Sequence, residues 1–387
     1  MEKVIGLVLS YKTTNYGSQL QAYATQYVIE KMGYATKIIT YVGMPSLASK
    51  IVGPGFFTSL YYSFLAKRKR RKTRIDISDE KYKQNNALRK KISEKFINDR
   101  LKNIRYYSKY SELVEDASQM AAVLIGSDQK WGPGFCYNRL STLDFVPNGV
   151  RRISYATSLG VSEYPMYCRK LSKKMWEKID CLSVREKQGA ELIKEICGAI
   201  PVEVVVDPTY LITKNEWKEL VPFRQMENED YVFCYFLGND DEEKNCAKRF
   251  AEKKGLKVIS IMSNESFTEK DNWYADKVVM GASPEDFINW IRGASYIFTD
   301  SFHGLAFSVI NEKQFYIFYR KRDDTRLSRN SRIDNILNLW GIEDRLIIDM
   351  SINWNHYLNK EIDYQKVREV VLSEREKSLN FLRKSLS

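Results

Sequence analysis

The chain has 387 residues, a length that favours two domains over a single core. Hydrophobic residues make up 44% of it and aromatic residues 13%, which excludes a disordered or collagen-like chain. Lysine and arginine number 61 against 49 acids, and the net charge of +12 indicates an acidic partner: a phosphorylated substrate, an anionic membrane or a nucleic acid.

The six cysteines form no CxxC pair and have no metal-ligand spacing with the two histidines. We therefore expect reduced thiols, a cytoplasmic location and no metal site. The apolar run at residues 4–9 is too short for a signal peptide, and no run reaches the roughly 18 apolar residues of a membrane span. These features predict a soluble protein.

Alternating strand and helix patterns open the chain. A buried strand at residues 4–9, a helical pattern ending at Gly33 and a strand at 37–41 predict a β–α–β unit in a parallel sheet. Residues from about 43 to 117 are strongly basic and predict a mostly helical insertion without a strand. The pattern then predicts strands at 121–125, 153–155, 181–184 and 202–206, with helices at 170–178 and 186–196.

A second alternating series follows Asp207, where Pro208 prevents a continuing strand. It predicts strands at 231–237, 258–261, 296–299 and 315–319, with helices at 241–254, 284–292 and 304–311. The fold prediction is therefore α/β, with two Rossmann-like domains facing a cleft. Their expected bounds are 1–210, including the insertion, and 211–358, followed by an amphipathic helix at 359–387.

His303 directly follows the strand predicted at 296–299 and lies at the start of a helix. In open α/β sheets this is where ligands bind, because the helix N-terminus favours anions. Imidazole has an unperturbed pKa near neutrality, so His303 is a candidate acid or base. An equally good interpretation is a histidine that only satisfies backbone groups at the helix start.

Polar turns follow other strands. The turn containing Asn15, Gly17 and Ser18 opens a helix and could hold an anion, although a Ser-capped helix explains it as well. It matches neither GxGxxG nor GxxxxGK[ST], so nothing supports a dinucleotide site or a P-loop. Asp128 is a candidate general base or hydroxyl ligand, or else a helix N-cap.

Arg185 ends another predicted strand, where its guanidinium could bind a phosphate or carboxylate. A surface ion pair with Glu186 or Glu191 is the competing interpretation. The remaining substrate-binding candidates lie in turns after strands or before a helix at 333–339: Ser127, Gln129, Ser154, Ser158, Asp300, Ser301, Gly304, Arg329 and Arg332.

Several of these segments occur in an order that resembles the polysaccharide pyruvyl transferase family. They are Asn15-Tyr16-Gly17 with Leu20-Gln21-Ala22-Tyr23, Gly126-Ser127-Asp128-Gln129 with Trp131, Ser154-Tyr155-Ala156, Ser183-Val184-Arg185-Glu186, Asp207-Pro208-Thr209 and Ser301-Phe302-His303-Gly304. The resemblance implies a two-domain fold similar to GT-B glycosyltransferases. It also implies transfer of pyruvate from phosphoenolpyruvate to sugar hydroxyls as a ketal, in cell-surface or exopolysaccharide biosynthesis, without a further cofactor.

On this resemblance, we expect His303 to act as acid and base, Arg185 to hold the donor anion, and Asp128 to bind the acceptor hydroxyl or move the second proton. Some similar proteins carry arginine two residues before the histidine, where this chain has Ser301. Either Arg329, Arg332 or a lysine replaces it, or the donor differs. The alternatives are a glycosyltransferase that uses a nucleotide sugar and an inactive sugar-binding relative.

An aromatic segment runs into a basic block between Phe56 and Lys72. Such a segment could contact an anionic membrane, which would suit a lipid-linked acceptor, or it could pack on the first domain with a solvated basic rim. Nucleic-acid binding is the weaker hypothesis because no zinc-finger, RNP-like or helix-turn-helix pattern accompanies the charge. We expect no nucleic-acid partner.

Overall fold

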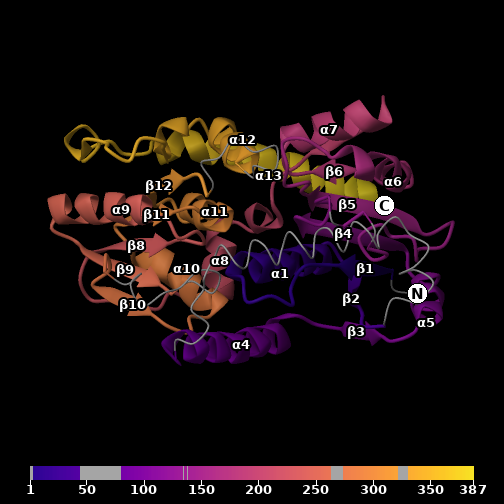
Figure 1. Ribbon diagram of the computed structural model, residues 1–387. Helices are drawn as coiled ribbons and strands as arrows, with labels where there is room; N and C mark the ends of the chain where they lie inside the picture. The colour runs from indigo at the N-terminus through magenta and orange to yellow at the C-terminus, as the bar shows by residue number, and fades with distance from the viewer. Residues whose placement is uncertain (1–2, 44–79, 134, 137, 263–272, 321–329) are drawn as a thin grey trace.

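Two parallel sheets organise the computed structural model, which describes residues 3–43, 80–133, 135–136, 138–262, 273–320 and 330–387. Each sheet forms the centre of one lobe, as Figure 1 shows. The sequence prediction of two Rossmann-like domains with a GT-B-like fold is thereby confirmed.

The first sheet has seven strands in the order β3-β2-β1-β4-β5-β6-β7. They are β1 (Val4–Val8), β2 (Ala35–Tyr41), β3 (Ile104–Tyr107), β4 (Ala122–Asp128), β5 (Arg151–Thr157), β6 (Ser183–Val184) and β7 (Glu203–Val204). Its helices are α1 (Tyr16–Lys31), α4 (Glu80–Arg100), α5 (Tyr110–Ala117), α6 (Met166–Trp176) and α7 (Lys187–Cys197).

The second sheet has six strands in the order β10-β9-β8-β11-β12-β13. They are β8 (Tyr231–Tyr235), β9 (Lys257–Ile261), β10 (Lys277–Val279), β11 (Tyr296–Thr299), β12 (Gln314–Phe318) and β13 (Leu346–Ile347). Its helices are α8 (Lys214–Leu220), α9 (Asp241–Lys254), α10 (Pro284–Gly293), α11 (Phe302–Ile310) and α12 (Ser331–Trp340). The short 3-10 helix η1 (Pro208–Leu211) lies in the connection between the sheets.

Both sheets reverse their strand order at one point, between β1 and β4 in the first and between β8 and β11 in the second. Open parallel sheets bind ligands at the carboxyl ends of the strands beside such a reversal. Polar side chains meet at both points. Ser18 bonds to Asp128 in the first sheet, and Asp300 accepts backbone N–H groups from Leu237 and Gly238 in the second.

An apolar core runs from one lobe to the other. It includes Leu20 of α1 together with Phe287 of α10 and Leu305 of α11, all with no measurable exposure. The Tyr16 ring at the start of α1 stacks on Phe287 with a centroid distance of 5.1 Å. The lobes are therefore joined by packed hydrophobic surface as well as by the chain.

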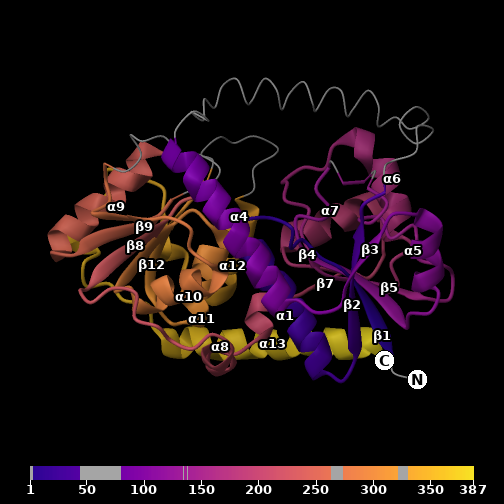
Figure 2. The same ribbon diagram turned by 90° about the horizontal axis from the view of Figure 1, so that it is seen from below.

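Helix α4 crosses between the lobes, as Figure 2 shows. Arg89 donates to the backbone oxygen of Met262 in the second lobe at 2.9 Å and to that of Thr14 in the first at 3.2 Å. Asn85 accepts the backbone N–H of Gly281 at 3.0 Å, and Arg100 pairs with Glu285. The buried face of α4 is largely polar, so hydrophobic periodicity gives no sign of this bridge.

The expectation of a strand-free insertion over residues 43–117 is wrong in its second half. Strand β3 pairs in parallel with β2, so β3 and α5 are a regular unit at the edge of the first sheet. The strand went unrecognised because Ile104-Arg105-Tyr106-Tyr107 is short and half exposed, without an apolar run. Residues 44–79 lie outside the described residues.

The C-terminal helix α13 (Tyr364–Leu386) spans both lobes along one side of the molecule (Figure 2). Near its end, Ser378 accepts the backbone N–H of Val206, and the backbone oxygen of Ser385 accepts from Arg151. The amphipathic helix predicted for the tail is therefore present and packs on the first lobe. The residue bounds of the domains stay a prediction, although the sheets themselves divide between Val204 and Tyr231.

The α4 bridge predicts a stability effect. Replacing the buried Arg89 by Met should lower the free energy of unfolding by about 1.5–3 kcal/mol, because it removes charged hydrogen bonds and leaves backbone carbonyls unpaired. Urea denaturation monitored by tryptophan fluorescence measures the change. The control is Lys90→Met, at the exposed neighbouring position. Equal stability of the two variants would contradict the bridge.

Candidate functional site

Charged side chains that are far apart in the sequence meet between the two lobes. Arg185 Nη1 lies 2.8 Å from Asp207 Oδ2, and Arg185 Nη2 lies 3.5 Å from Asp128 Oδ1. His303 Nε2 lies 3.7 Å from the same Asp207 Oδ2. The structure thus brings His303 and Arg185, one from each lobe, to a single carboxylate oxygen.

Each member of this cluster stands at the end of a strand or the start of a helix. Asp128 is the last residue of β4, and Arg185 directly follows β6. Asp207 caps η1 in the connection between the lobes, and His303 is in the first turn of α11. Asp128 has a φ of +70°, a left-handed conformation that aspartate adopts more readily than most residues and that is common at functional sites.

Both carboxylate oxygens of Asp207 accept hydrogen bonds. Its Oδ1 accepts from the backbone N–H of Thr209 at 3.1 Å and from the Thr209 hydroxyl at 2.9 Å. Its Oδ2 accepts from the Ser127 hydroxyl at 3.1 Å, in addition to the Arg185 contact. The residue is only 1% exposed, so these donors replace water around the carboxylate.

The electrostatics keep the carboxylates ionised. Burial by itself would raise the pKa of Asp207, but His303 and Arg185 together hold it well below its ordinary value. Burial likewise opposes ionisation of Asp128, and the charges of Arg185, His303 and Arg332 and the Ser18 hydroxyl lower its pKa. The pKa of Arg185 is raised against burial, chiefly by Asp207 and Asp128.

His303 lies directly against the backbone of α1. A Cβ atom built on Gly17 would come within 2.0 Å of His303 Nδ1, so only glycine permits this approach. The His303 side chain retains 9% exposure. The helix-start glycine of the first lobe and the helix-start histidine of the second therefore form one contact surface.

Phe302 places two guanidinium groups beside the histidine. Arg185 Cζ lies 4.5 Å and Arg332 Cζ 5.9 Å from the centroid of the Phe302 ring. The ring is nearly perpendicular to the His303 imidazole, at 87° and 5.2 Å. Two cations and an imidazole thus surround one aromatic side chain, an arrangement suited to an anion.

Some of the other candidates from the sequence lie in this cluster. Ser18 Oγ donates to Asp128 Oδ2 at 2.9 Å, and Asn15 caps α1 by accepting the backbone N–H of Ser18. Gln129 follows Asp128 and packs against Gly160. The helix is thus capped by Asn15 and not by a serine, as the competing interpretation expected, and Ser18 is the residue that contacts the charged cluster.

Other candidates have structural partners. Ser154 donates to the backbone oxygen of Ser183, and Ser158 donates to Glu186. Both oxygens of Asp300 accept backbone N–H groups, and Ser301 caps α11 by accepting from Gly304. Arg329 lies outside the described residues.

Three residues of this region are not among the candidates predicted from the sequence. In the sequence, Asp207 marks only the end of a strand, although its Asp-Pro-Thr segment is part of the family resemblance. Phe302 had no signal apart from its place next to His303. Lys130 follows Asp128 by two residues, and burial lowers the pKa of its ammonium to about 8, against the opposing charge of Asp128.

Among the described residues, no three His, Cys, Asp or Glu side chains gather as they would around a metal ion. The same residues contain no helix with the length and apolar character needed to cross a bilayer. All six cysteines lie within the described residues, and none of them forms a disulfide bond.

The lowered pKa of Asp128 predicts a pH effect on stability. A carboxylate whose pKa is lower in the folded state stabilises the protein above its unfolded pKa of about 4, and this contribution is lost between about pH 5 and the folded value. As the pH falls through that range, the free energy of unfolding should therefore decrease less in Asp128→Asn than in the wild type. Denaturation at pH 7, 5 and 4 tests it, with the exposed Asp99→Asn as control. A slope as steep as that of the wild type would refute the assignment.

Solved structures of other proteins share the two-lobed fold. The chain is similar to the UDP-N-acetylglucosamine 2-epimerase of Rickettsia bellii, with 10% identity, coverage of 100% of this chain and 97% of that chain, and a TM-score of 0.51. It is equally similar to a protein of Listeria monocytogenes assigned as the same epimerase, with 11% identity, coverage of 98% and 90%, and a TM-score of 0.51. At these identities the likeness shows the fold alone.

A search of curated proteins found no match to the sequence. The sequence model of the family described as polysaccharide pyruvyl transferase, however, matches residues 15–322. This range contains Asp128, Arg185, Asp207 and His303. The chain belongs to the polysaccharide pyruvyl transferase family and is a transferase.

Proposed function

We propose that the enzyme transfers pyruvate from phosphoenolpyruvate to two hydroxyls of a saccharide, forming a cyclic ketal and releasing phosphate. The observation that carries the proposal is the contact of His303 with Asp207, beside the guanidinium groups of Arg185 and Arg332 around Phe302. This places a proton carrier next to cations that suit a donor with a phosphate and a carboxylate.

The reaction balances without a cofactor. One sugar oxygen bonds to C2 of the donor while C3 gains a proton and becomes a methyl group. The second sugar oxygen then bonds to C2 as the C2–O bond to phosphate breaks. The two hydroxyl protons end on C3 and on phosphate, so the enzyme only has to carry them.

His303 fits this carrier role. It is the histidine of the charged cluster, and its Nε2 lies 3.7 Å from the ionised carboxylate of Asp207, the kind of partner that a proton-carrying imidazole needs. Asp207 in turn is fixed by Thr209 and Ser127, so it orients the imidazole without itself needing to titrate. We assign His303 the acid and base steps and Asp207 a positioning role.

We assign binding of the anionic donor to Arg185 and Arg332. Arg185 already faces Asp207 and Asp128, which compensate its charge and hold its guanidinium in place. Arg332 is only partly buried and approaches the same aromatic ring from α12. We assign to it the additional positive charge that an arginine in place of Ser301 would bring.

We assign binding of the acceptor sugar to Asp128. Its side chain is 23% exposed, whereas those of Arg185 and Asp207 are 1% and 0% exposed. Its pKa is lowered, so it is ionised and can accept a hydrogen bond from a sugar hydroxyl. We further propose a cytoplasmic location and a lipid-linked acceptor. Contact with the membrane would be made by the segment between Phe56 and Lys72, which lies outside the described residues.

Loss of the imidazole should abolish most activity. His303→Gln should lower kcat/KM by about 10²–10⁴-fold, the usual contribution of one general acid–base group. Phosphate release from phosphoenolpyruvate with a panel of saccharides measures the rate. His356→Gln, at the other, exposed histidine, should retain activity. Full activity in the His303 variant would exclude the proposed role.

A thermal-shift measurement on the wild type tests the donor. Stabilisation by a nucleotide sugar but not by phosphoenolpyruvate would favour a glycosyltransferase.

Arg332 should act mainly on donor binding. Arg332→Gln should raise the KM for phosphoenolpyruvate about 10–100-fold with a smaller change in kcat, because a charged contact to the donor is lost. The measurement is steady-state phosphate release at a saturating acceptor concentration. Arg105→Gln, at an exposed arginine on β3, is the control. An unchanged KM would assign the donor charge to other residues.

A further inference from the structure

A pocket of about 470 Å³ opens between η1, α8, α11 and α13, away from the charged cluster. It lies at the C-terminal end of α11, whose N-terminal end carries His303. Tyr210 of η1 lines it, three residues after Asp207. The volume is within the range of pockets that bind small molecules, roughly 300–1,000 Å³.

The floor of this pocket is apolar. Val309 and Ile310 come from the end of α11, where both are buried. Helix α13 contributes Val367, Val371 and Leu372, of which Leu372 is 50% exposed. A half-exposed leucine over a hydrophobic floor leaves apolar surface that a ligand could cover.

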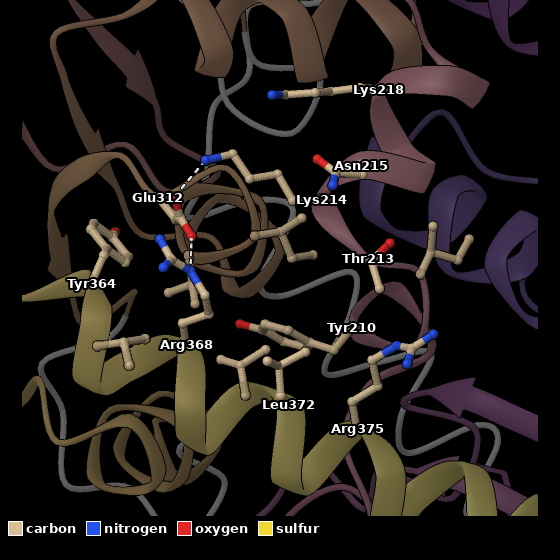
Figure 3. A pocket seen from close by; sticks show the side chains of 15 residues that line it. Tyr210, Thr213, Lys214, Asn215, Lys218, Glu312, Tyr364, Arg368, Leu372 and Arg375 are labelled. Carbon is tan, nitrogen blue, oxygen red and sulfur yellow. Dashed lines mark hydrogen bonds and ion pairs between the residues drawn. The ribbon is translucent and has the colours of Figure 1, made fainter.

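The rim of the pocket is cationic. Its lining includes Lys214, Lys218, Arg368 and Arg375 against a single carboxylate, Glu312. Glu312 is already neutralised, because Lys214 Nζ lies 2.5 Å and Arg368 Nε 2.8 Å from its two oxygens. Figure 3 shows both contacts, with Lys218 on the far side of Lys214 from Arg368. Arg375 pairs with Glu216, which is outside the lining, at 3.6 Å, so Lys218 supplies the remaining positive charge next to the apolar floor.

Tyr210 also lines the pocket. The residue is only 1% exposed, its hydroxyl is buried, and its ring centroid lies 5.3 Å from that of Trp340. It therefore adds aromatic surface to the floor and does not offer an accessible polar group.

We propose that this pocket binds an amphiphile with one anionic headgroup and a hydrocarbon chain, such as an alkyl phosphate. The chain would cover Val309, Val371 and Leu372, while the headgroup would lie at Lys218. Neither a free inorganic anion nor a neutral detergent satisfies both halves of the site. The inference does not rest on the proposed catalytic function, because the pocket shares no residue with the charged cluster.

Isothermal titration calorimetry with dodecyl phosphate below its critical micelle concentration tests the proposal. We expect saturable binding of one molecule per chain, with at least tenfold weaker affinity in both Leu372→Glu and Lys218→Glu. Val370→Glu and Lys366→Glu are matched controls, since both positions are exposed on α13 outside the pocket and should keep wild-type affinity. Circular dichroism checks that each variant is folded.

Further ligands separate the two halves of the site and the source of the headgroup. Inorganic phosphate and dodecyl maltoside should each bind at least tenfold more weakly than dodecyl phosphate. Sedimentation with vesicles of anionic phospholipid that depends on Leu372 and Lys218 would identify a membrane headgroup, whereas its absence would identify a free amphiphile. Failure to bind dodecyl phosphate and vesicles, or binding unchanged in both pocket variants, would overturn the proposal.

Discussion

The carboxylate of Asp207 is the interaction on which the site depends. One of its oxygens is shared by Arg185 from the first lobe, His303 from the second and the Ser127 hydroxyl. A buried carboxylate with so many donors is stable only as an anion, and its charge in turn holds the guanidinium and the imidazole in place. Asp207 lies in the connection between the two sheets, so the segment that links the lobes also carries the central residue of the charged cluster.

The fold creates this site because the points at which the two sheets reverse their strand order face each other. Each sheet presents the carboxyl ends of its central strands, so the loops after β1 and β4 meet the start of α11. The apolar core shared by α1, α10 and α11 then fixes the distance between the lobes, and Arg89 on α4 adds a polar tie to both. Without that packing, Gly17 and His303 would not be in contact.

Hydrophobic periodicity was sufficient to predict both sheets, because their central strands are continuous apolar runs followed by helices with clear caps. It failed for β3, β10 and β13, which are short strands at or near sheet edges, where half-exposed residues carry no pattern. His303 and Arg185 were identified because titratable groups at strand ends are informative. Asp207 and Phe302 were not, because their importance comes from contacts across the lobes, and a linear pattern does not record which turns face one another.

The placement of Gly17 against His303 links chemistry to the relative position of the lobes. The His303 imidazole belongs to one lobe, the helix against it belongs to the other, and its carboxylate partner Asp207 belongs to the segment between them. Any rotation that parted the lobes would strip the imidazole of its charge partner and admit water at once. The electrostatic environment of His303 is therefore a property of the interface between the lobes and not of either lobe alone.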